Sequence, residues 1–462
     1  MWGVNINASA PNGKAGTWLL DPADITINGG PTAGMPVLPP ANVFAPLTGV
    51  NSATLAVADL INALQAGGGT NVTITTTNTG VQGTPSNVAP ASGLGDITIA
   101  SALTWAVGGT ATLTLNAVGD VNINAAVSMT NGNLVVCCGR DINVRAAITG
   151  ATAGSVFLSA GRDISVVRSL ANIGTDITVT NGNITMCAGR DIVLSNTFNA
   201  PTALITINDS NITVPHGLGL TPGLELSAGN AATGPGVAGG TVSFTVGTKI
   251  ALTKAGANPL AVNVDYNPVS YTAPTDYLPL FTLVGTSPLV QRMLVYPGGA
   301  NKVFDGTTTA VFTSFQPDIN GLVPGGGGLT LAGGGTANFA NTGPGLNIPI
   351  TFSGFTLAGP NAANFALPIG CCGAITRTTG TITVAPIVVA PGVVSLDNGL
   401  PFAVLPVLYP FTQLAGMDLV VEGITMPPVV LAEAPPPPVE VAPPPPPPAF
   451  VPPPFAPRRT RN

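Results

Sequence analysis

The sequence predicts an all-β chain in which a parallel β-helix is followed by a small β-rich domain and a disordered Pro-rich tail. The first observation is a duplicated phrase, TNGNLVVCCGRDI at residues 130–142 and TNGNITMCAGRDI at residues 180–192. The second is a series of Gly-Asp and Gly-Arg-Asp corners with successive spacings of 24, 21 and 22 residues, at Asp96, Asp120, Asp141 and Asp163. A period in the low twenties is typical of a solenoid, in which each repeat forms one coil.

The third observation is the alternation of apolar and polar residues between these corners. Ile97 and Ile99, Val121 and Ile123, and Ile164 and Val166 are examples of the period of two that is typical of strands. Gly and Asp favour turns, so each corner joins two short strands. A chain that turns at every corner and returns after about 22 residues is a parallel β-helix.

These patterns divide the chain into five parts. Residues 31–92 are rich in Pro and Gly and are expected to be an irregular insertion with a short helix at 52–65, capped by Ser52. The parts are a β-helix coil remnant (1–30), the insertion (31–92), the parallel β-helix shaft and its end (93–290), a small β domain (291–387), and a linker with the Pro-rich tail (388–462).

Composition argues against several classes of function. Only 7% of residues are charged and the net charge is −6, whereas phosphate binding needs clustered Lys and Arg, so nucleic acid is not an expected partner. No transmembrane segment is expected, because prolines interrupt the most apolar stretch, residues 381–411. We expect no cofactor and no metal site.

The first residues, MWGVNINASAPNGKAG, do not have the pattern of a secretory signal peptide. Val4, Ile6 and Ala8 already alternate with polar residues as in the later coils, so we expect that the natural N-terminus is missing. A β-helix with an open end exposes strand edges, and self-association through these ends is expected.

The five cysteines are Cys137, Cys138, Cys187, Cys371 and Cys372. An odd number with two vicinal pairs does not indicate a disulfide framework. Cys137 and Cys187 occupy equivalent positions two coils apart, about 9 to 10 Å at the strand spacing, which is too far for a disulfide. We therefore expect the cysteines to be small buried residues.

The shaft region resembles the large secreted adhesins of the filamentous haemagglutinin type, which Gram-negative bacteria export by two-partner secretion. The resemblance rests on GTWLLDPADITI (16–27), ALQAGGGTNVTITT (63–76), GDITIASALTW (95–105), LTLNAVGDVNINAAV (113–127), NVDYNPVSYTAPTDY (263–277) and the Gly-Arg-Asp-Ile corners. It implies a right-handed β-helix at the cell surface or outside the cell, an outer-membrane two-partner transporter, and contact with host cells, glycans or other bacteria.

The small β domain resembles the Tyr-Asp-Gly repeat domain found near the C-terminal ends of these adhesins. The matching phrases are KVFDGTTTAVF (302–312), FSGFTLAGPNAANFAL (352–367) and TGTITVAP (379–386). Phe304 and Phe365 stand where that family has Tyr, so the fold is better supported than any role for a tyrosine hydroxyl. The chain is thus interpreted as the C-terminal part of such an adhesin.

The candidate contact residues lie at the Gly-Arg-Asp corners. They are Arg140, Asp141, Arg162, Asp163, Arg190 and Asp191. The three arginines could form a surface row that binds an anionic glycan. The alternative, which we favour, is that each Arg neutralises the Asp beside it and covers the coil with its aliphatic stem.

We expect a non-enzymatic surface-exposed or secreted adhesin, a rigid stalk that mediates attachment or biofilm formation. One alternative is a polysaccharide-processing β-helix enzyme, which needs two carboxyl groups about 5 to 10 Å apart. The first 224 residues contain no Glu, and the only His, His216, has no evident partner, so no catalytic residue is assigned. The other alternative is a truncated, non-exported remnant of a larger adhesin gene.

Overall fold

The structure is a computed structural model. It describes residues 24–36, 42–47, 50, 52–76, 95–197, 202–210, 223–236, 240–245, 247–256, 259–371 and 378–384. The chain divides into two units, Met1–Val388 and Val389–Asn462. The whole second unit, including the predicted Pro-rich tail, lies outside the described residues, as do His216, Cys372 and most of the predicted coil remnant.

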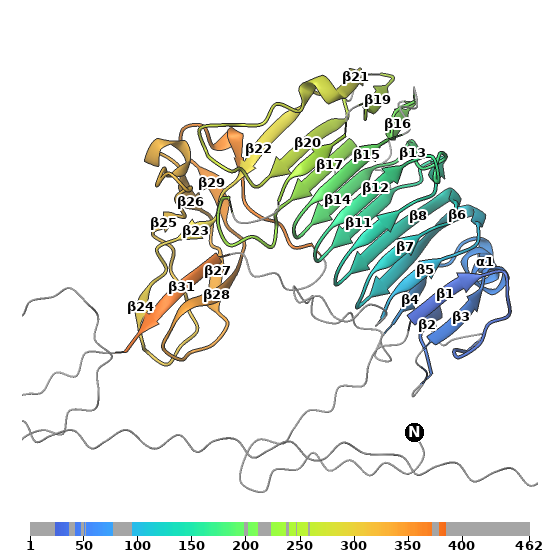
Figure 1. Cartoon of the computed structure of the whole chain (residues 1–462), viewed down its shortest axis with the longest axis horizontal. Helices are drawn as coiled ribbons and strands as arrows, with labels where there is room; N and C mark the ends of the chain where they lie inside the picture. The colour runs from blue at the N-terminus through green and yellow to red at the C-terminus, as the bar shows by residue number, and fades with distance from the viewer. Residues whose placement is uncertain are drawn as a thin grey trace, which may run out of the picture. The chain divides into compact units, whose positions relative to one another are not determined.

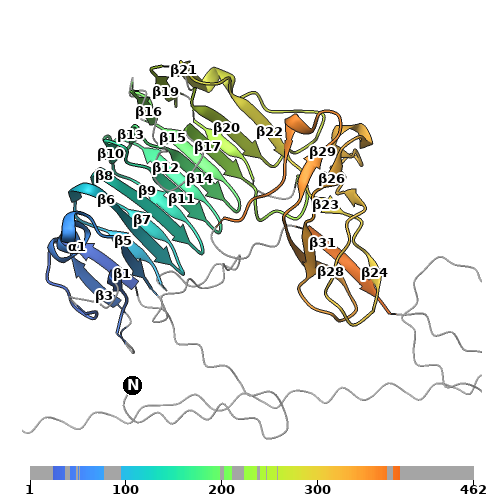
Figure 2. The ribbon, with the colours of Figure 1, turned by 180° about the vertical axis from the view of Figure 1, so that it is seen from behind.

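One face of the shaft is an eight-stranded sheet whose neighbouring strands are all parallel (Figure 1, Figure 2). Along the sheet the strands are β3 (Ser52–Ala56), β1 (Asp24–Asn28), β5 (Ile97–Ile99), β7 (Val121–Ile123), β9 (Ile142–Val144), β12 (Ile164–Arg168), β15 (Ile192–Asn196) and β18 (Val242–Phe244).

The second sheet has 15 strands and folds around the other two faces. Its two long strands, β6 (Leu103–Ala117) and β8 (Val127–Cys138), run along both faces. One face continues with β10 (Ile148–Ala151), β13 (Ile177–Thr180), β16 (Ile205–Asp209), β19 (Ile250–Lys254) and β21 (Phe281–Val284). The other continues with β11 (Val156–Ala160), β14 (Ile184–Ala188), β17 (Gly223–Ala228), β20 (Ala261–Tyr266), β22 (Val290–Leu294) and β30 (Phe365–Ala366), and β2 (Val43–Phe44) and β4 (Val72–Thr75) extend the sheet beyond β6.

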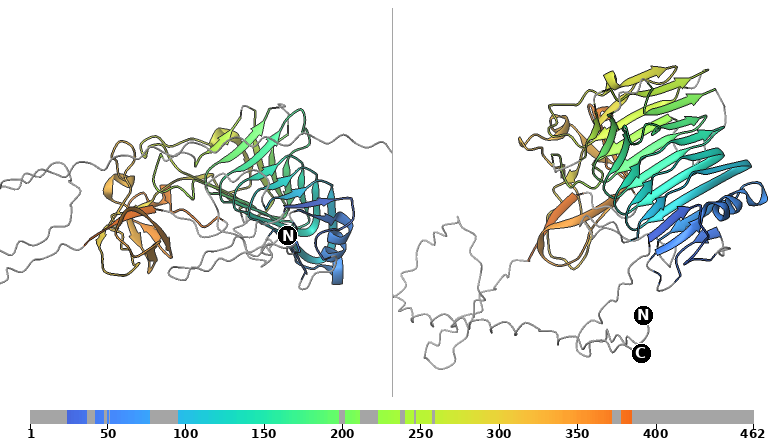
Figure 3. Two further views of the ribbon diagram at one scale, coloured as in Figure 1. Left: turned by 60° about the horizontal axis from the view of Figure 1, so that its bottom comes forward. Right: turned by 45° about the vertical axis from the view of Figure 1, so that its right-hand side comes forward.

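The predicted parallel β-helix is confirmed by the register of these strands. The coils stack on one another along the shaft (Figure 3). Equivalent apolar residues pair directly from coil to coil, so the interior consists of stacked columns. One column contains Ile97, Val121, Ile142, Ile164, Ile192 and Val242, and no member is more than 3% exposed. Stacking of this kind removes apolar surface from water and pairs nearly every strand on both edges.

The duplicated TNGN phrase forms the corner between the two faces of the larger sheet. Asn131 and Asn181 adopt left-handed backbone conformations, with φ of 53° and 54°, which Asn tolerates better than most residues. Asn133 Oδ1 accepts a hydrogen bond from the Ser155 amide at 3.1 Å, and Ser155 Oγ accepts one from the Asn183 amide at 3.1 Å. The duplication therefore reflects a polar column that fixes the same corner in successive coils.

The segment expected to be an irregular insertion is instead part of the shaft where it is described. Its strand β3 pairs with β1 over five residues, and β4 pairs with β6. The helix, α1 (Val57–Gln65), begins five residues later than predicted, because Ala53 and Leu55 are buried strand residues. Ser52 is therefore not the cap, and Thr32 Oγ1 accepts the Ala56 amide at 2.9 Å and bonds to Asp59 at 2.5 Å.

The small β domain begins where the shaft ends. It contains β23 (Pro297–Gly298), β24 (Lys302–Val303), β25 (Ser314–Phe315), β26 (Thr330–Ala332), β27 (Thr336–Phe339), β28 (Gly345–Ser353), β29 (Thr356–Ala358) and β31 (Thr378–Thr383). Strands β24, β31, β28 and β27 form a four-stranded sheet over a separate core that includes Phe339, Ile350 and Phe352. Its strand β30 pairs in parallel with β22 and so extends the shaft sheet by one strand.

Candidate functional site

The Asp residues of the corners form a continuous ladder along the shaft. Each Asp accepts, through Oδ1, the backbone amide of the equivalent residue in the next coil, at distances between 2.7 and 3.2 Å. The ladder runs through Asp24, Asp96, Asp120, Asp141, Asp163 and Asp191 to the Thr241 amide. Because a carboxylate that accepts a backbone N–H forms a charge-assisted bond, each corner fixes the position of the next.

The three candidate arginines lie within this ladder, and each pairs with an Asp of the preceding coil. Arg140 binds Asp120 through two parallel hydrogen bonds of 2.8 and 2.7 Å. Arg162 binds Asp141, and Arg190 binds Asp163, in the same bidentate manner. The expected ion pairs with the adjacent Asp are present for two of the arginines at longer range, since Arg162 Nε is 3.9 Å from Asp163 and Arg190 Nε is 3.6 Å from Asp191. The expectation missed the closer partner of each Arg, which is the Asp of the preceding coil.

Exposure of the arginine side chains increases along the row. It is 8% for Arg140, 27% for Arg162 and 48% for Arg190. The hydrogen bonds that Arg190 donates to Asp163 are the main cause that raises the pKa of Arg190 above its ordinary value. Two nitrogens of each guanidinium already donate to a carboxylate, so Arg190, the most exposed of the three arginines, is the one most open to an anionic ligand.

The interval of 28 residues between Asp163 and Asp191 is longer than the other intervals between corners, but the strands on either side keep the register of the sheet. The additional residues lie in a loop after β12, where Leu170 and Ile173 are 81% and 60% exposed. Arg168, only 1% exposed, holds this loop by donating to the Thr175 carbonyl at 2.8 Å and the Thr202 carbonyl at 2.9 Å. An insertion is tolerated here because the strands before and after it still stack.

A pair of carboxyl groups that the sequence did not reveal lies near the end of the shaft. Glu225 and Asp265 lie on neighbouring strands, and burial raises the pKa of each above its ordinary value. Arg292 donates two hydrogen bonds of 2.7 Å to Asp265. Neither carboxyl group lines the cavities beside Phe315, Phe244 or Phe365 in the described part of the chain, and the bidentate partner keeps Asp265 from moving freely toward a substrate.

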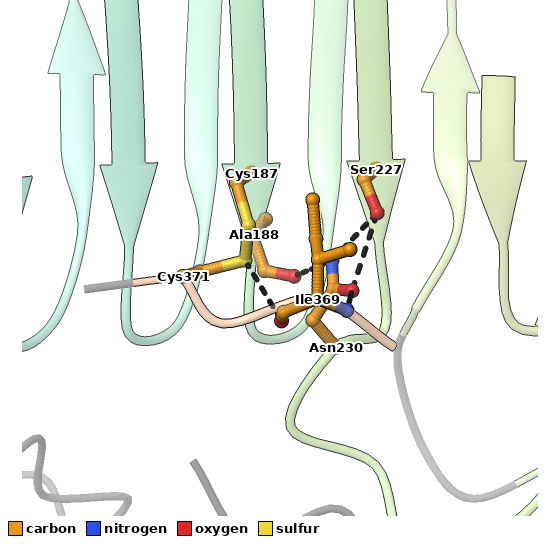
Figure 4. The surroundings of a disulfide bond; sticks show 6 residues. All are labelled: Cys187, Ala188, Ser227, Asn230, Ile369 and Cys371. Carbon is orange, nitrogen blue, oxygen red and sulfur yellow. Dashed lines mark hydrogen bonds between the residues drawn. A yellow bond between two sulfur atoms is a disulfide. The ribbon is translucent and has the colours of Figure 1, made fainter. Parts of the chain in front are cut away.

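The prediction that the cysteines form no disulfide framework is wrong. Cys187 on β14 is bonded to Cys371, 184 residues later, with a Cα separation of 5.3 Å (Figure 4). Cys137 is also disulfide-bonded, and Cys138 is a buried free thiol. The relation between Cys137 and Cys187 was correctly predicted, since Ser159 pairs with both and separates them by two coils. The partner of Cys187 was missed because it comes from the distant β domain.

Asn230 supports the segment that carries the disulfide (Figure 4). Its side chain is fully buried; Oδ1 accepts the Ile369 amide at 2.8 Å, and Nδ2 donates to the Ala188 carbonyl at 3.1 Å. Cys187 and Cys371 are 1% and 0% exposed. The disulfide is therefore surrounded by protein, and this buried amide helps to hold the segment after β30, residues 367–371, against the shaft.

Further polar contacts join the β domain to the last coils. Asp318 accepts hydrogen bonds from Ser270 Oγ at 2.6 Å and from the Tyr271 amide at 3.1 Å. Tyr296, which is fully buried, donates its hydroxyl to the Gly229 carbonyl at 3.0 Å. Together with the β22–β30 pairing and the disulfide, these contacts make the domain a cap on one edge of the shaft.

The VFDG phrase of the domain forms a turn held by Asp305. Lys302 Nζ donates to Asp305 Oδ1 at 2.8 Å, and the Thr307 amide donates to the same oxygen at 2.9 Å. These bonds lower the pKa of Asp305 to about 2. Phe304 is 44% exposed, so the position that the resembling family fills with Tyr faces solvent here.

One domain of the chain matches a known protein family. The YDG domain family matches residues 294–370, which confirms the Tyr-Asp-Gly-type domain that the sequence predicted. No curated protein and no solved structure matches the chain. The match covers less than half of the chain, so it identifies one domain and not the whole protein. This YDG domain follows the parallel β-helix in the chain.

The described part of the chain was also compared with what a membrane span and a metal site require. None of its helices is long and apolar enough to cross a membrane. Within the same residues, no three His, Cys, Asp or Glu side chains gather in an arrangement that could hold a metal ion.

Proposed function

We propose that the protein is a non-enzymatic adhesin, exposed on the surface of a Gram-negative bacterium or secreted from it, in which the β-helix is a stalk that presents the YDG domain. The observation that carries the proposal is the docking of the YDG domain on the last coils, where β30 extends the shaft sheet and the Cys187–Cys371 disulfide joins the two. Such a connection transmits force from the domain to the stalk without a flexible joint.

The disulfide also supports a location outside the cytoplasm. Structural disulfides form and persist in oxidising compartments and are rare where thiols are kept reduced. Export by a two-partner transporter, attachment to a host or bacterial glycan or protein, and a role in biofilm formation belong to this proposal.

The proposal is tested by deleting the gene and measuring attachment to epithelial cells, mucin and abiotic surfaces. We expect attachment to fall and to return when the complete gene is supplied again. Unchanged attachment on every surface would refute the adhesin proposal.

A second candidate function, polysaccharide processing, is favoured by the raised pKa values of Glu225 and Asp265. A carboxyl group with a raised pKa can serve as a general acid. Incubation with capsule and pectin-like polymers would reveal released products, and Glu225→Gln should abolish them if the pair is catalytic. We favour the adhesin because Asp265 is already engaged by Arg292.

A further inference from the structure

The last strand on one face of the shaft, β21, has a free edge. It pairs in parallel with β19, and no other strand in the described part of the chain pairs with it (Figure 1, Figure 2). The YDG domain continues a different face, because its strand β30 pairs with β22. The backbone N–H and C=O groups on the outer edge of β21 are therefore available to another strand.

The apolar side of β21 is incompletely covered. Phe281 and Leu283 pack against the shaft core but are only partly buried. The residues of β19 with which they pair, Ile250 and Leu252, are 0% exposed. The difference arises because no described strand follows β21 on this face. A strand added at this edge would form backbone hydrogen bonds and complete the burial of both side chains.

Strand β21 lacks the features by which natural proteins protect an edge. Such edges carry charged residues, Pro or a bulge. The strand reads FTLV, its register with β19 is uninterrupted, and residues 278–290 contain no charged side chain. By contrast, the terminal strand β3 at the other end of the shaft is covered, since Thr54 and Ala33 exchange two backbone hydrogen bonds of 2.8 and 2.9 Å.

The sequence of β21 is complementary to itself. In an antiparallel pair, directly opposite side chains lie on the same side of the sheet. A twofold axis at Thr282 places this residue opposite Thr282 of a second copy, and Phe281 opposite Leu283. Apolar side chains then meet on the core side and hydroxyl groups on the outer side, and no like charges are brought together. An isologous contact of this kind closes after two copies.

We propose that β21 pairs in antiparallel orientation with β21 of a second copy of this chain, around a twofold axis at Thr282. Backbone hydrogen bonds between the two edges supply affinity, and the alternation of Phe281, Thr282 and Leu283 fixes the register. The dimer carries two YDG domains, so it binds a surface with repeated ligands more tightly than a single chain does. The pairing itself does not depend on the adhesin proposal.

The test measures the dimer dissociation constant of the full chain by analytical ultracentrifugation over a range of concentrations. We expect a dimer that dissociates on dilution. Thr282→Lys should raise the dissociation constant at least about tenfold, the equivalent of about 1.4 kcal/mol, because it places two like charges directly opposite each other. Thr282→Glu should have the same effect, and an equimolar mixture of the two variants should associate again.

Thr178→Lys is the matched control. Thr178 lies in the same outward column as Thr282, but its strand β13 is paired on both edges, with β10 and β16. This variant should leave the dissociation constant unchanged. Hydrogen exchange gives a second measurement, because the amides of β21 should exchange more slowly at concentrations where the dimer forms, and those of β13 should not change.

Three results would overturn the proposal. The first is a wild-type chain that stays monomeric at every concentration or that continues to associate beyond two copies. The second is a Thr282→Lys chain that associates as strongly as the wild type. The third is a mixture of Thr282→Lys and Thr282→Glu that associates no more strongly than either variant alone, because Thr282 then does not lie opposite itself.

Discussion

Removal of the Cys187–Cys371 disulfide should weaken the attachment of the YDG domain to the shaft. In the chain-entropy treatment, a link across 184 residues stabilises the folded state by about 5 kcal/mol, at the upper end of the range found for disulfides. We expect the double variant Cys187→Ala, Cys371→Ala to lose about 2–5 kcal/mol, and the loss to be concentrated where the domain meets the shaft.

Hydrogen exchange is the suitable assay, because a solenoid need not unfold in one step. The Val295 amide donates to the Ala366 carbonyl at 2.9 Å, and the Ile369 amide donates to Asn230 at 2.8 Å, so both report on docking. In the double variant these amides should exchange faster by a factor of about 30 or more, the equivalent of about 2 kcal/mol. The amides of β9 and β12 should keep their protection.

The control is Cys138→Ala, which removes a buried thiol that forms no disulfide. This variant should leave exchange at Val295 and Ile369 unchanged. Equal protection of these amides in the wild type and the double variant would refute the claim that the disulfide holds the domain in place.

Three further predictions concern charged groups. Asp141→Ala should lower the free energy of unfolding of the shaft by about 2–3 kcal/mol in calorimetry, because it removes the hydrogen bonds that the Asp141 carboxylate accepts from Arg162 and from the next coil. An unchanged free energy of unfolding would exclude a structural role for the Asp ladder. Lys254→Met should lower the free energy of unfolding by about 3–5 kcal/mol, because it removes the cation that pairs with Asp209 at 2.7 Å inside the shaft. The double variant Lys254→Met, Asp209→Leu should be less destabilised than the single variant, because it leaves no unpaired buried charge. The Asp305 carboxyl group should titrate near pH 2 by NMR. The stability that its hydrogen bonds contribute is then complete above about pH 4 and is lost as the pH falls through 2. A measured pKa near 3.8 would contradict these bonds.

The coil repeat could be predicted from the sequence because its cause is local. Each Asp stabilises the corner of the next coil, so the chain must repeat a residue with a short acceptor side chain at every turn. The period therefore appears directly in the positions of Asp96, Asp120 and Asp141. Even the longer interval before Asp191 preserves the register, because a loop accommodates the extra residues.

The partners of the charged and sulfur-containing side chains could not be predicted in the same way. The side chain of Arg140 reaches the preceding coil, where it forms two hydrogen bonds with the Asp120 carboxylate instead of with Asp141 beside it in sequence. The partner of Cys187 depends on which edge of the shaft the YDG domain covers. That choice is made by long-range packing of residues such as Tyr296 and Asn230, and no spacing in the sequence encodes it.

The start of α1 illustrates a competition between local and long-range preferences. Ser52 is a good helix cap, and the residues after it can form a helix. The strand pairing of Ser52–Ala56 with Asp24–Asn28 buries Ala53 and Leu55 against the core and prevails over the local preference.

We propose that the chain acts outside the cytoplasm with its YDG domain held on the stalk by the Cys187–Cys371 disulfide. The most direct measurement labels intact cells with a membrane-impermeant biotin reagent, blocks free thiols, and maps the peptides of the recovered chain by mass spectrometry without reduction. We expect a surface-labelled chain in which the peptides containing Cys187 and Cys371 are joined. Recovery of the chain only from the cytoplasm, with Cys187 blocked as a free thiol, would contradict it.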